Sequence, residues 1–196
     1  MPVYQNSRSL GLIHLLLGLV LVLMGQTVFL CKPYYIIYTM LVVLEGANGA
    51  GKTTLIEELK KHYNFKIYKE PRSLVQNIKD LLHWRETTGQ WLLNKWQNEI
   101  VLLDRYTLST LIYNVIINKD LSYEDYLQHC KKCAKPDLVI VLTAPLDVIS
   151  QRRPNLDKET AKRIMKLYHL YALASDKARL FSDTEQAKQF ILSCVS

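Results

Sequence analysis

Over most of the chain, short apolar runs alternate with longer polar or amphipathic stretches. The apolar runs at 41–44, 65–68, 100–103, 138–142 and 180–181 are typical of buried strands. The stretches between them predict helices. This alternation predicts an α/β fold of three layers, with a parallel sheet of about five strands and helices on both faces. Ligands of such sheets bind where the strands end, so the chemistry is expected directly after each strand.

The beginning of the chain does not follow this alternation. Residues 10–31 are almost wholly apolar and are numerous enough to cross a bilayer as one helix. No Asp or Glu occurs before Glu45, so the segment also differs in composition from the rest of the chain. The sequence therefore predicts two parts, an apolar extension over residues 1–39 and an α/β domain over residues 40–196.

Three interpretations of the extension stay open. It is a membrane anchor through residues 10–31, a cleaved signal peptide whose apolar run follows Arg8, or an extension upstream of a functional start at Met40. Secretion conflicts with the four cysteines, which show no oxidative design. We expect a cytoplasmic protein, anchored to a membrane with residues 40–196 facing the cytosol if residues 10–31 are retained.

Composition narrows the class of protein. The 196 residues include 25 Lys and Arg against 18 Asp and Glu, for a formal net charge of +7. Such a balance attracts phosphates, nucleic acids or anionic lipids. The sequence contains no basic run interleaved with aromatic residues, so it gives little support to nucleic-acid binding. The four cysteines are too few and too scattered for a secreted disulfide scaffold. His129, Cys130 and Cys133 lack the second ligand pair that a zinc site needs.

A phosphate-binding loop follows the first predicted strand. The run is Gly46-Ala47-Asn48-Gly49-Ala50-Gly51-Lys52-Thr53, with Thr54 opening the next helix. Its glycines let successive backbone N–H groups point at phosphates, and the helix directs its positive end toward the same charge. Lys52 is placed for the β- and γ-phosphates of ATP and Thr53 for Mg²⁺. GTPases, motor ATPases and small-molecule kinases share this loop, so it does not by itself identify the family.

Two further strand ends carry polar groups. Glu70-Pro71-Arg72 follows the second predicted strand, and Asp104-Arg105-Tyr106 follows the third. In a parallel sheet these segments and the phosphate loop meet at one edge. With the phosphate loop, the predicted domain over residues 40–196 has the three-layer arrangement of P-loop NTPases. Two acidic and two basic groups beside bound phosphates suit phosphoryl transfer, which needs alignment and positive charge around the transferring oxygens.

Several ordered motifs resemble the thymidylate kinase family. The segment from Val101 to Tyr113 resembles that family's Asp-Arg-Tyr/His motif, including its spacing to Ser109 and Tyr113. The segment from Lys135 to Leu142 is similar to its Pro-Asp-strand signature, and Leu156-Asp157-Lys158-Glu159 to its lid. The phosphate loop, preceded by Glu45, has the family's Glu-Gly start.

The resemblance implies roles for individual residues. Asp104 would help to organise Mg²⁺, and Arg105 would bridge the acceptor phosphate. Since positions 47–50 contain no basic residue, the lid must supply the catalytic arginine, and Arg152 and Arg153 are the candidates. The acceptor site would be made by Glu70, Arg72, Arg85, Arg105 and Tyr113.

Asn48 occupies the loop position at which the family often has an acidic residue that contacts the deoxyribose. The uncharged amide indicates altered discrimination among sugars. Trp84 is a candidate stacking face for the base. The stretch between Glu70 and Asp104 is shorter than in the family pattern. The family also implies a homodimer.

The predicted function is transfer of the γ-phosphoryl group of ATP, with Mg²⁺, to dTMP. Two alternatives stay open. A deoxynucleoside kinase would use Glu70 as the base for a 5′-hydroxyl, and a non-catalytic or membrane-tethered protein would only bind nucleotide. The arginines at 72, 85 and 105 favour an anionic acceptor over a nucleoside.

Overall fold

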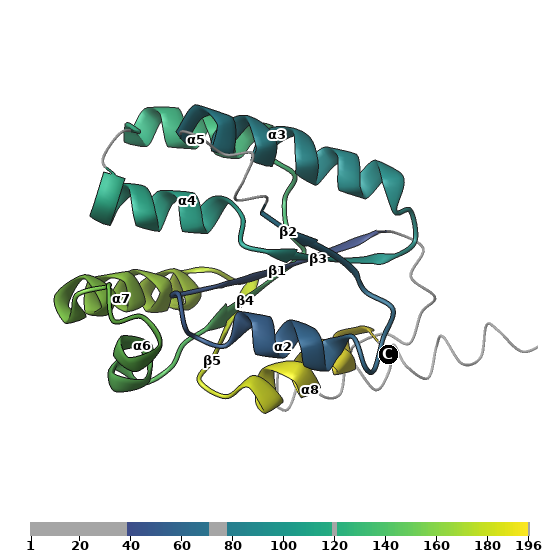
Figure 1. Ribbon diagram of the computed structural model, residues 1–196. Helices are drawn as coiled ribbons and strands as arrows, with labels where there is room; N and C mark the ends of the chain where they lie inside the picture. The colour runs from purple at the N-terminus through teal and green to yellow at the C-terminus, as the bar shows by residue number, and fades with distance from the viewer. Residues whose placement is uncertain (1–38, 71–77, 119–120, 196) are drawn as a thin grey trace, which may run out of the picture. The chain divides into compact units, whose positions relative to one another are not determined.

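The computed structural model describes residues 39–70, 78–118 and 121–195 (Figure 1). Its centre is a five-stranded parallel sheet with strand order β2-β3-β1-β4-β5. The strands are β1 (Met40–Gly46), β2 (Lys66–Lys69), β3 (Ile100–Asp104), β4 (Leu138–Leu142) and β5 (Ala178–Phe181). The predicted parallel sheet is therefore confirmed, with every predicted strand present.

Helices connect the strands. They are α2 (Lys52–Leu59), α3 (Ile78–Lys95), α4 (Thr107–Tyr113), the π-helical turn η1 (Asn114–Asn118), α5 (Tyr123–Lys132), α6 (Leu146–Arg152), α7 (Lys158–Ala174) and α8 (Thr184–Val195). Helix α2 begins at Lys52, two residues before the predicted start at Thr54. The helix starts earlier because the loop already turns at Gly51, whose φ is +101°. Among the described residues no helix is long and apolar enough to span a membrane. Residues 10–31 lie outside the described part of the chain.

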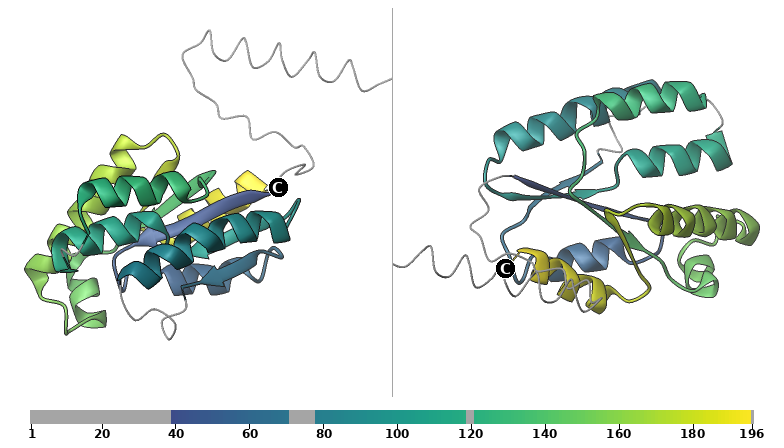
Figure 2. Two further views of the ribbon diagram at one scale, coloured as in Figure 1. Left: turned by 90° about the horizontal axis from the view of Figure 1, so that it is seen from above. Right: turned by 180° about the vertical axis from the view of Figure 1, so that it is seen from behind.

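Alternating strand residues build two cores, one on each face of the sheet. Leu41 and Val43 of β1 pack in the core that includes residues of α3, α4 and α7. Val42 and Leu44 pack in the core beneath α2 and α8. Figures 1 and 2 show the resulting three layers. Because both faces are covered, the strands are apolar on both sides, which is why they appear as continuous apolar runs in the sequence.

A glycine inside α3 sets how closely this helix approaches the end of β3. A Cβ atom at Gly89 would overlap the Tyr106 hydroxyl and lie 3.0 Å from Cβ of Ala134. The Tyr106 hydroxyl donates to the carbonyl oxygen of Arg85 at 3.1 Å. Gly89 thus admits the ring of Tyr106 beneath α3 and joins this helix to the Asp104-Arg105-Tyr106 segment.

Candidate active site

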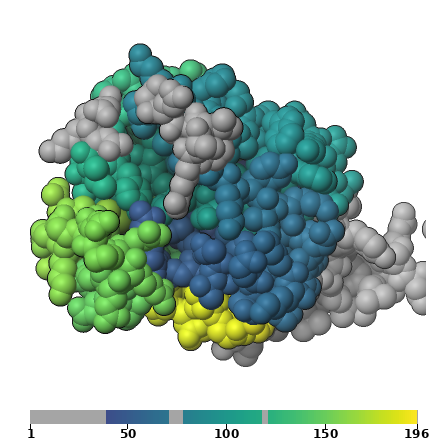
Figure 3. Space-filling model, viewed as in Figure 1, coloured from purple at the N-terminus to yellow at the C-terminus, as the bar shows by residue number. Residues whose placement is uncertain are grey.

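The phosphate loop leaves β1 at Gly46, whose φ of +135° only glycine adopts readily. A Cβ atom here would also overlap the carbonyl oxygen of Leu142 on β4. From the start of α2, the Lys52 ammonium donates to the carbonyl oxygens of Gly46 at 2.8 Å and Ala47 at 3.0 Å. In Figure 3 the loop lies at the surface, between the green α6–α7 region and the blue α2. Phosphates therefore have access to the loop.

The Lys52 ammonium is held in an unfavourable electrostatic environment. Burial and the neighbouring Arg105 guanidinium lower its pKa to about 7, although Asp104 and Glu45 act in the opposite direction. The side chain contacts no carboxylate directly; its hydrogen bonds in the described structure go to carbonyl oxygens. An anionic ligand at the loop would supply the countercharge that the site lacks.

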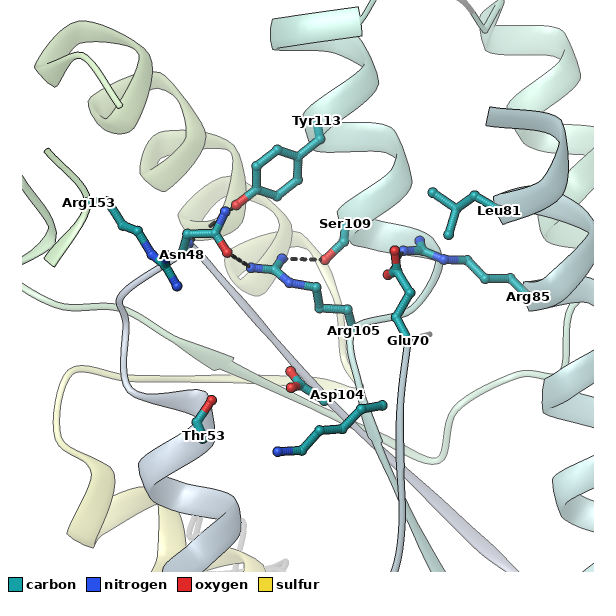
Figure 4. Close-up of a pocket in the computed structure, with 11 residues that line it drawn as sticks. Asn48, Thr53, Glu70, Leu81, Arg85, Asp104, Arg105, Ser109, Tyr113 and Arg153 are labelled. Carbon is teal, nitrogen blue, oxygen red and sulfur yellow. Dashed lines mark hydrogen bonds and ion pairs between the residues drawn. The ribbon is translucent and has the colours of Figure 1, made fainter. Parts of the chain in front are cut away.

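Arg105 lies at the centre of the site (Figure 4). Its backbone has a φ of +75°, and its N–H donates to the carbonyl oxygen of Leu44 at 2.9 Å. The guanidinium donates to the Ser109 hydroxyl at 2.9 Å and to Oδ1 of Asn48 at 2.8 Å. It also lies 5.2 Å from the ring centre of Tyr113. These contacts fix the guanidinium beside the phosphate loop through neutral partners.

Glu45 anchors this region from beneath, a role that no sequence motif assigned to it. The side chain is fully buried at the end of β1. One carboxylate oxygen accepts from the backbone N–H groups of Tyr106 at 2.9 Å and Ser109 at 3.2 Å. The other accepts from the hydroxyls of Ser109 and, at 3.4 Å, of Tyr168. Glu45 thereby ties the phosphate loop to the start of α4 and to α7. The sequence signal that could have revealed this role is an acidic residue at the end of an otherwise apolar strand.

Glu70 and Arg85 form an ion pair at the wall of the pocket. Nη2 of Arg85 lies 2.8 Å from Oε2 of Glu70. Arg85 is 1% exposed, and its Nη1 also donates to the Tyr106 carbonyl oxygen and the Thr110 hydroxyl. Both Nη atoms of this guanidinium therefore donate to protein groups. Arg85 lines the larger pocket, and its contacts fit a residue that positions Glu70.

Arg152 and Arg153, the arginines predicted for a lid, lie at the end of α6 beside the phosphate loop. Nη1 of Arg152 donates to the carbonyl oxygen of Gly49 at 2.7 Å. A Cβ atom at Gly49 would lie 3.3 Å from Cβ of Arg152, so the end of α6 packs closely on this glycine. Arg153 makes no such bond to the loop in the described structure, and its side chain lines both pockets of the site.

Two adjoining pockets occupy the carboxyl end of the sheet. The larger, of about 510 Å³, lies between α3, α4 and the loop, and its lining residues include Glu70, Leu81, Arg85, Ser109 and Tyr113. The smaller, of about 250 Å³, follows the phosphate loop and includes Gly49, Gly51, Lys52, Thr54 and Arg152. Five residues line both pockets: Asn48, Thr53, Asp104, Arg105 and Arg153. A donor in one pocket and an acceptor in the other would meet at these shared residues.

The shared residues also suit a hydrated magnesium ion. Oδ1 of Asp104 is buried and has no hydrogen-bond partner among the described residues, which leaves a carboxylate oxygen available. The Thr53 side chain lines the same two pockets from the start of α2. A carboxylate and a hydroxyl fit Mg²⁺, which binds few protein groups and completes its shell with phosphates and water.

The structure thus brings most of the predicted site residues together. The predicted phosphate loop, Asp104, Arg105, both lid arginines, Glu70, Arg85 and Tyr113 all lie around the two pockets. Arg72 falls outside the described residues. Trp84 is partly buried and packs against the core that includes Leu92 of α3.

The fold and the loop define a P-loop nucleotide-binding protein, and comparison with known proteins agrees. Residues 41–173 match the model of the AAA domain family. The chain is 29% identical over 156 residues to "Probable thymidylate kinase 1" of Saccharolobus solfataricus, spanning 67% of this chain and 80% of that protein. It is 31% identical over 144 residues to "Probable thymidylate kinase" of Metallosphaera sedula, spanning 63% of this chain and 72% of that protein.

Among solved structures, the thymidylate kinase of Candida albicans superimposes with a TM-score of 0.61 at 16% identity, over 81% of this chain and 91% of the other. That similarity concerns the fold. Together with the curated relatives, it agrees with the motifs noted in the sequence. The chain belongs to the thymidylate kinase family.

Proposed function

We propose that this protein is an ATP-dependent kinase that transfers the γ-phosphoryl group of ATP to dTMP, giving dTDP for dTTP synthesis. The observation that carries the proposal is the pair of adjoining pockets that share Asp104, Arg105 and Arg153. ATP would place its phosphates along the phosphate loop, and dTMP would occupy the larger pocket. The donor and acceptor phosphates would then face each other across Arg105.

The residues act by alignment and by charge. The loop N–H groups and Lys52 hold the β- and γ-phosphates, while Arg105 orients the acceptor phosphate for in-line attack. Arg153, with Arg152 beside it, supplies positive charge to the equatorial oxygens as the group moves. Thr53 and Asp104 would hold Mg²⁺, which neutralises phosphate charge when bound.

The charge at Arg105 supports a monophosphate acceptor. Its side-chain hydrogen bonds in the described structure go to Asn48, Ser109 and Tyr168, all of which are uncharged. No carboxylate that the structure describes hydrogen-bonds to this guanidinium. Its charge therefore remains available to the phosphate of a nucleotide, whereas a nucleoside would leave it without an anionic partner.

One observation favours a second candidate, a deoxynucleoside kinase. The Glu70 carboxylate lies at the pocket wall, and its ion pair with Arg85 fixes its position. A carboxylate placed this way could accept the proton of a 5′-hydroxyl. In the dTMP reaction the same carboxylate would serve to orient the acceptor.

One assay separates these functions. The full chain is incubated with ATP, Mg²⁺ and, in turn, dTMP, dUMP, dCMP, dGMP, thymidine or deoxycytidine, and products are separated by anion exchange. Diphosphate from dTMP is expected. Monophosphate from thymidine would instead support the nucleoside kinase, and tight ATP binding without any product would leave only a nucleotide-binding role.

We further propose that residues 10–31 attach the protein to a membrane, with the kinase domain of residues 40–196 in the ATP-containing cytoplasm. The apolar length of the segment supports this attachment. Flotation of the native protein with membranes after a carbonate wash tests it, and intact mass shows whether the chain starts at Met1. A mature chain that starts at Met40 would contradict the attachment.

A homodimer is also proposed. Tyr123 and Leu127 lie one turn apart on α5 and are 63% and 40% exposed, which makes an apolar face suited to a partner helix. Light scattering of the protein in mild detergent measures the mass. A monomer at micromolar concentration would refute the dimer.

A further inference from the structure

Aromatic rings and ammonium groups gather where the edge strand β2 meets the end of α3. Lys95 lies 4.5 Å from the ring centre of Trp91 and 5.1 Å from that of Trp96. Lys66 lies 5.1 Å from the Trp96 ring on another side, and Tyr68 meets the Trp91 ring edge-on at 5.6 Å. We call these five residues the Trp–Lys patch. Trp91 is 47% exposed, so the patch reaches the surface.

The patch lies where the chain enters the domain. The Thr39 hydroxyl donates to the carbonyl oxygen of Trp96 at 2.9 Å, and the Met40 N–H donates to that of Glu99 at 3.1 Å. Figure 1 shows the end of α3 on the same side of the molecule as the start of β1. The phosphate loop follows the other end of β1, about 20 Å away for a strand of this length. Lys66 and Trp96 therefore lie toward the amino end of the sheet and the two pockets at its carboxyl end, while Tyr68 of the patch is next to Lys69, which lines the larger pocket.

Only a short stretch of sequence separates an apolar segment from Thr39. Residues 10–31 are apolar, and Lys32-Pro33-Tyr34-Tyr35 follows them directly, with Tyr38 next to Thr39. The eight residues from 32 to 39 span at most about 28 Å when fully extended. If residues 10–31 lie in a bilayer, the patch cannot lie far from its surface.

We propose that the Trp–Lys patch docks on the anionic headgroups of the bilayer that holds residues 10–31, with the nucleotide pockets facing away from it. The inference rests on the membrane attachment proposed above and is independent of the kinase activity. Indole rings prefer the headgroup region, and each lysine near an anionic leaflet adds about 1 kcal/mol of attraction. Such docking would leave nucleotides free access from the aqueous side.

Charge makes a lipid surface a better occupant of the patch than a second copy of the chain. Two copies meeting through the same patch would oppose Lys66 and Lys95 to the same lysines of the partner. The Lys66 ammonium lies 3.5 Å from Oε1 of Glu99, so it is partly neutralised. Lys95 is exposed and has no carboxylate within ion-pair distance among the described residues. An anionic surface would supply the missing countercharge.

The three tryptophans of the chain make the test direct. Trp84, Trp91 and Trp96 all lie in α3 or directly after it, and residues 1–39 contain none. The full chain is reconstituted in phosphatidylcholine vesicles with or without about 30% phosphatidylserine, and quenching of tryptophan fluorescence by brominated lipids is measured. We expect quenching in the anionic vesicles that falls at least twofold in neutral vesicles and in about 0.5 M salt.

Two charge reversals on one helix provide matched variants. Lys95→Glu, at the end of α3, should lower the quenching at least twofold, because it places a negative charge in the patch. Lys79→Glu, an exposed lysine about 24 Å away at the start of the same helix, should leave it unchanged. Trp91→Phe should remove the most strongly quenched part of the emission. All three variants should retain wild-type dTMP turnover, since these residues line neither pocket.

The outcomes are distinguishable. Failure of the chain to float with vesicles would refute the membrane attachment and the docking with it. A chain that floats but shows equal quenching with both lipids, or in Lys95→Glu, would overturn the docking alone. A change of oligomeric mass in Lys95→Glu without a change in quenching would assign the patch to a protein interface and likewise overturn it.

Discussion

The protonation of Lys52 leads to a prediction that can be measured in solution. Burial and Arg105 lower its pKa to about 7 in the nucleotide-free protein. At pH 8, one unit above that value, only about one tenth of the Lys52 side chains carry a proton. A bound triphosphate favours the ammonium, so binding at this pH should take up about 0.9 proton per site. ATP itself is almost fully deprotonated at pH 8, so it releases almost no protons on binding. The expected sign is therefore net proton uptake.

Isothermal titration calorimetry gives this number directly. ATP is titrated into the protein in several buffers of different ionisation enthalpy, and the slope of the observed enthalpy against the buffer value is the number of protons exchanged. Lys52→Arg is the matched control, because a guanidinium stays charged at every pH used. Its slope should be near zero at pH 8. Equal slopes for both proteins would show that Lys52 is already charged in the free site and would refute the argument.

The same lowered pKa makes stability depend on pH. Between pH 7 and the ordinary value of 10.5, the unfolded chain binds more protons at Lys52 than the folded chain does. The free energy of unfolding should therefore rise with pH across this window. Lys52→Met, which removes the buried charge, should be more stable than the wild type at pH 6 to 7, and the difference should shrink toward pH 10 in urea titrations. A constant difference would contradict the lowered pKa.

Three further substitutions test separate parts of the site. Arg153→Ala should lower the turnover number about 100-fold or more and change KM for ATP by less than about threefold; unchanged turnover in both this variant and Arg152→Ala would remove the lid hypothesis. Gly89→Ala should lower the free energy of unfolding by about 2 kcal/mol despite alanine's better helix propensity, and adding Tyr106→Phe should restore part of it. Thermal denaturation of the wild type, the two single variants and the double variant shows whether the clash with the Tyr106 hydroxyl is responsible. Glu45→Gln should destabilise by about 2 to 3 kcal/mol, because an amide presents donors where Ser109 and Tyr168 also donate; an unchanged urea midpoint would show that the buried network contributes little.

Much of the fold could be predicted from sequence because its signals are local. The phosphate loop is a run of eight consecutive residues between a buried strand and a helix, and most strands are short apolar runs followed by polar residues. The rule that strand ends converge then predicted that Glu70, Asp104 and the loop lie together, as they do in the larger pocket. Local pattern and sheet topology were sufficient for this part.

The contacts that hold the site depend on residues far apart in sequence. Glu45 meets Ser109 from 64 residues away and Tyr168 from 123 residues away, and no periodicity links those positions. The family resemblance assigned Arg85 to the acceptor site. The structure pairs Arg85 with Glu70, and Gly89 lets α3 pack on Tyr106; no local signal in the sequence predicts either contact.

The position of Asn48 shows how the two halves of the site are coupled. Its backbone N–H donates to the Tyr113 hydroxyl at 3.3 Å, and its side-chain oxygen accepts from Arg105 at 2.8 Å. The tip of the phosphate loop is therefore held by side chains that also line the acceptor pocket. An acid here would neutralise Arg105, whereas the amide holds the same geometry and leaves the positive charge intact. The amide thus leaves a stronger field for the phosphate of the proposed acceptor. Selection among acceptors should therefore depend on the phosphate more than on the sugar.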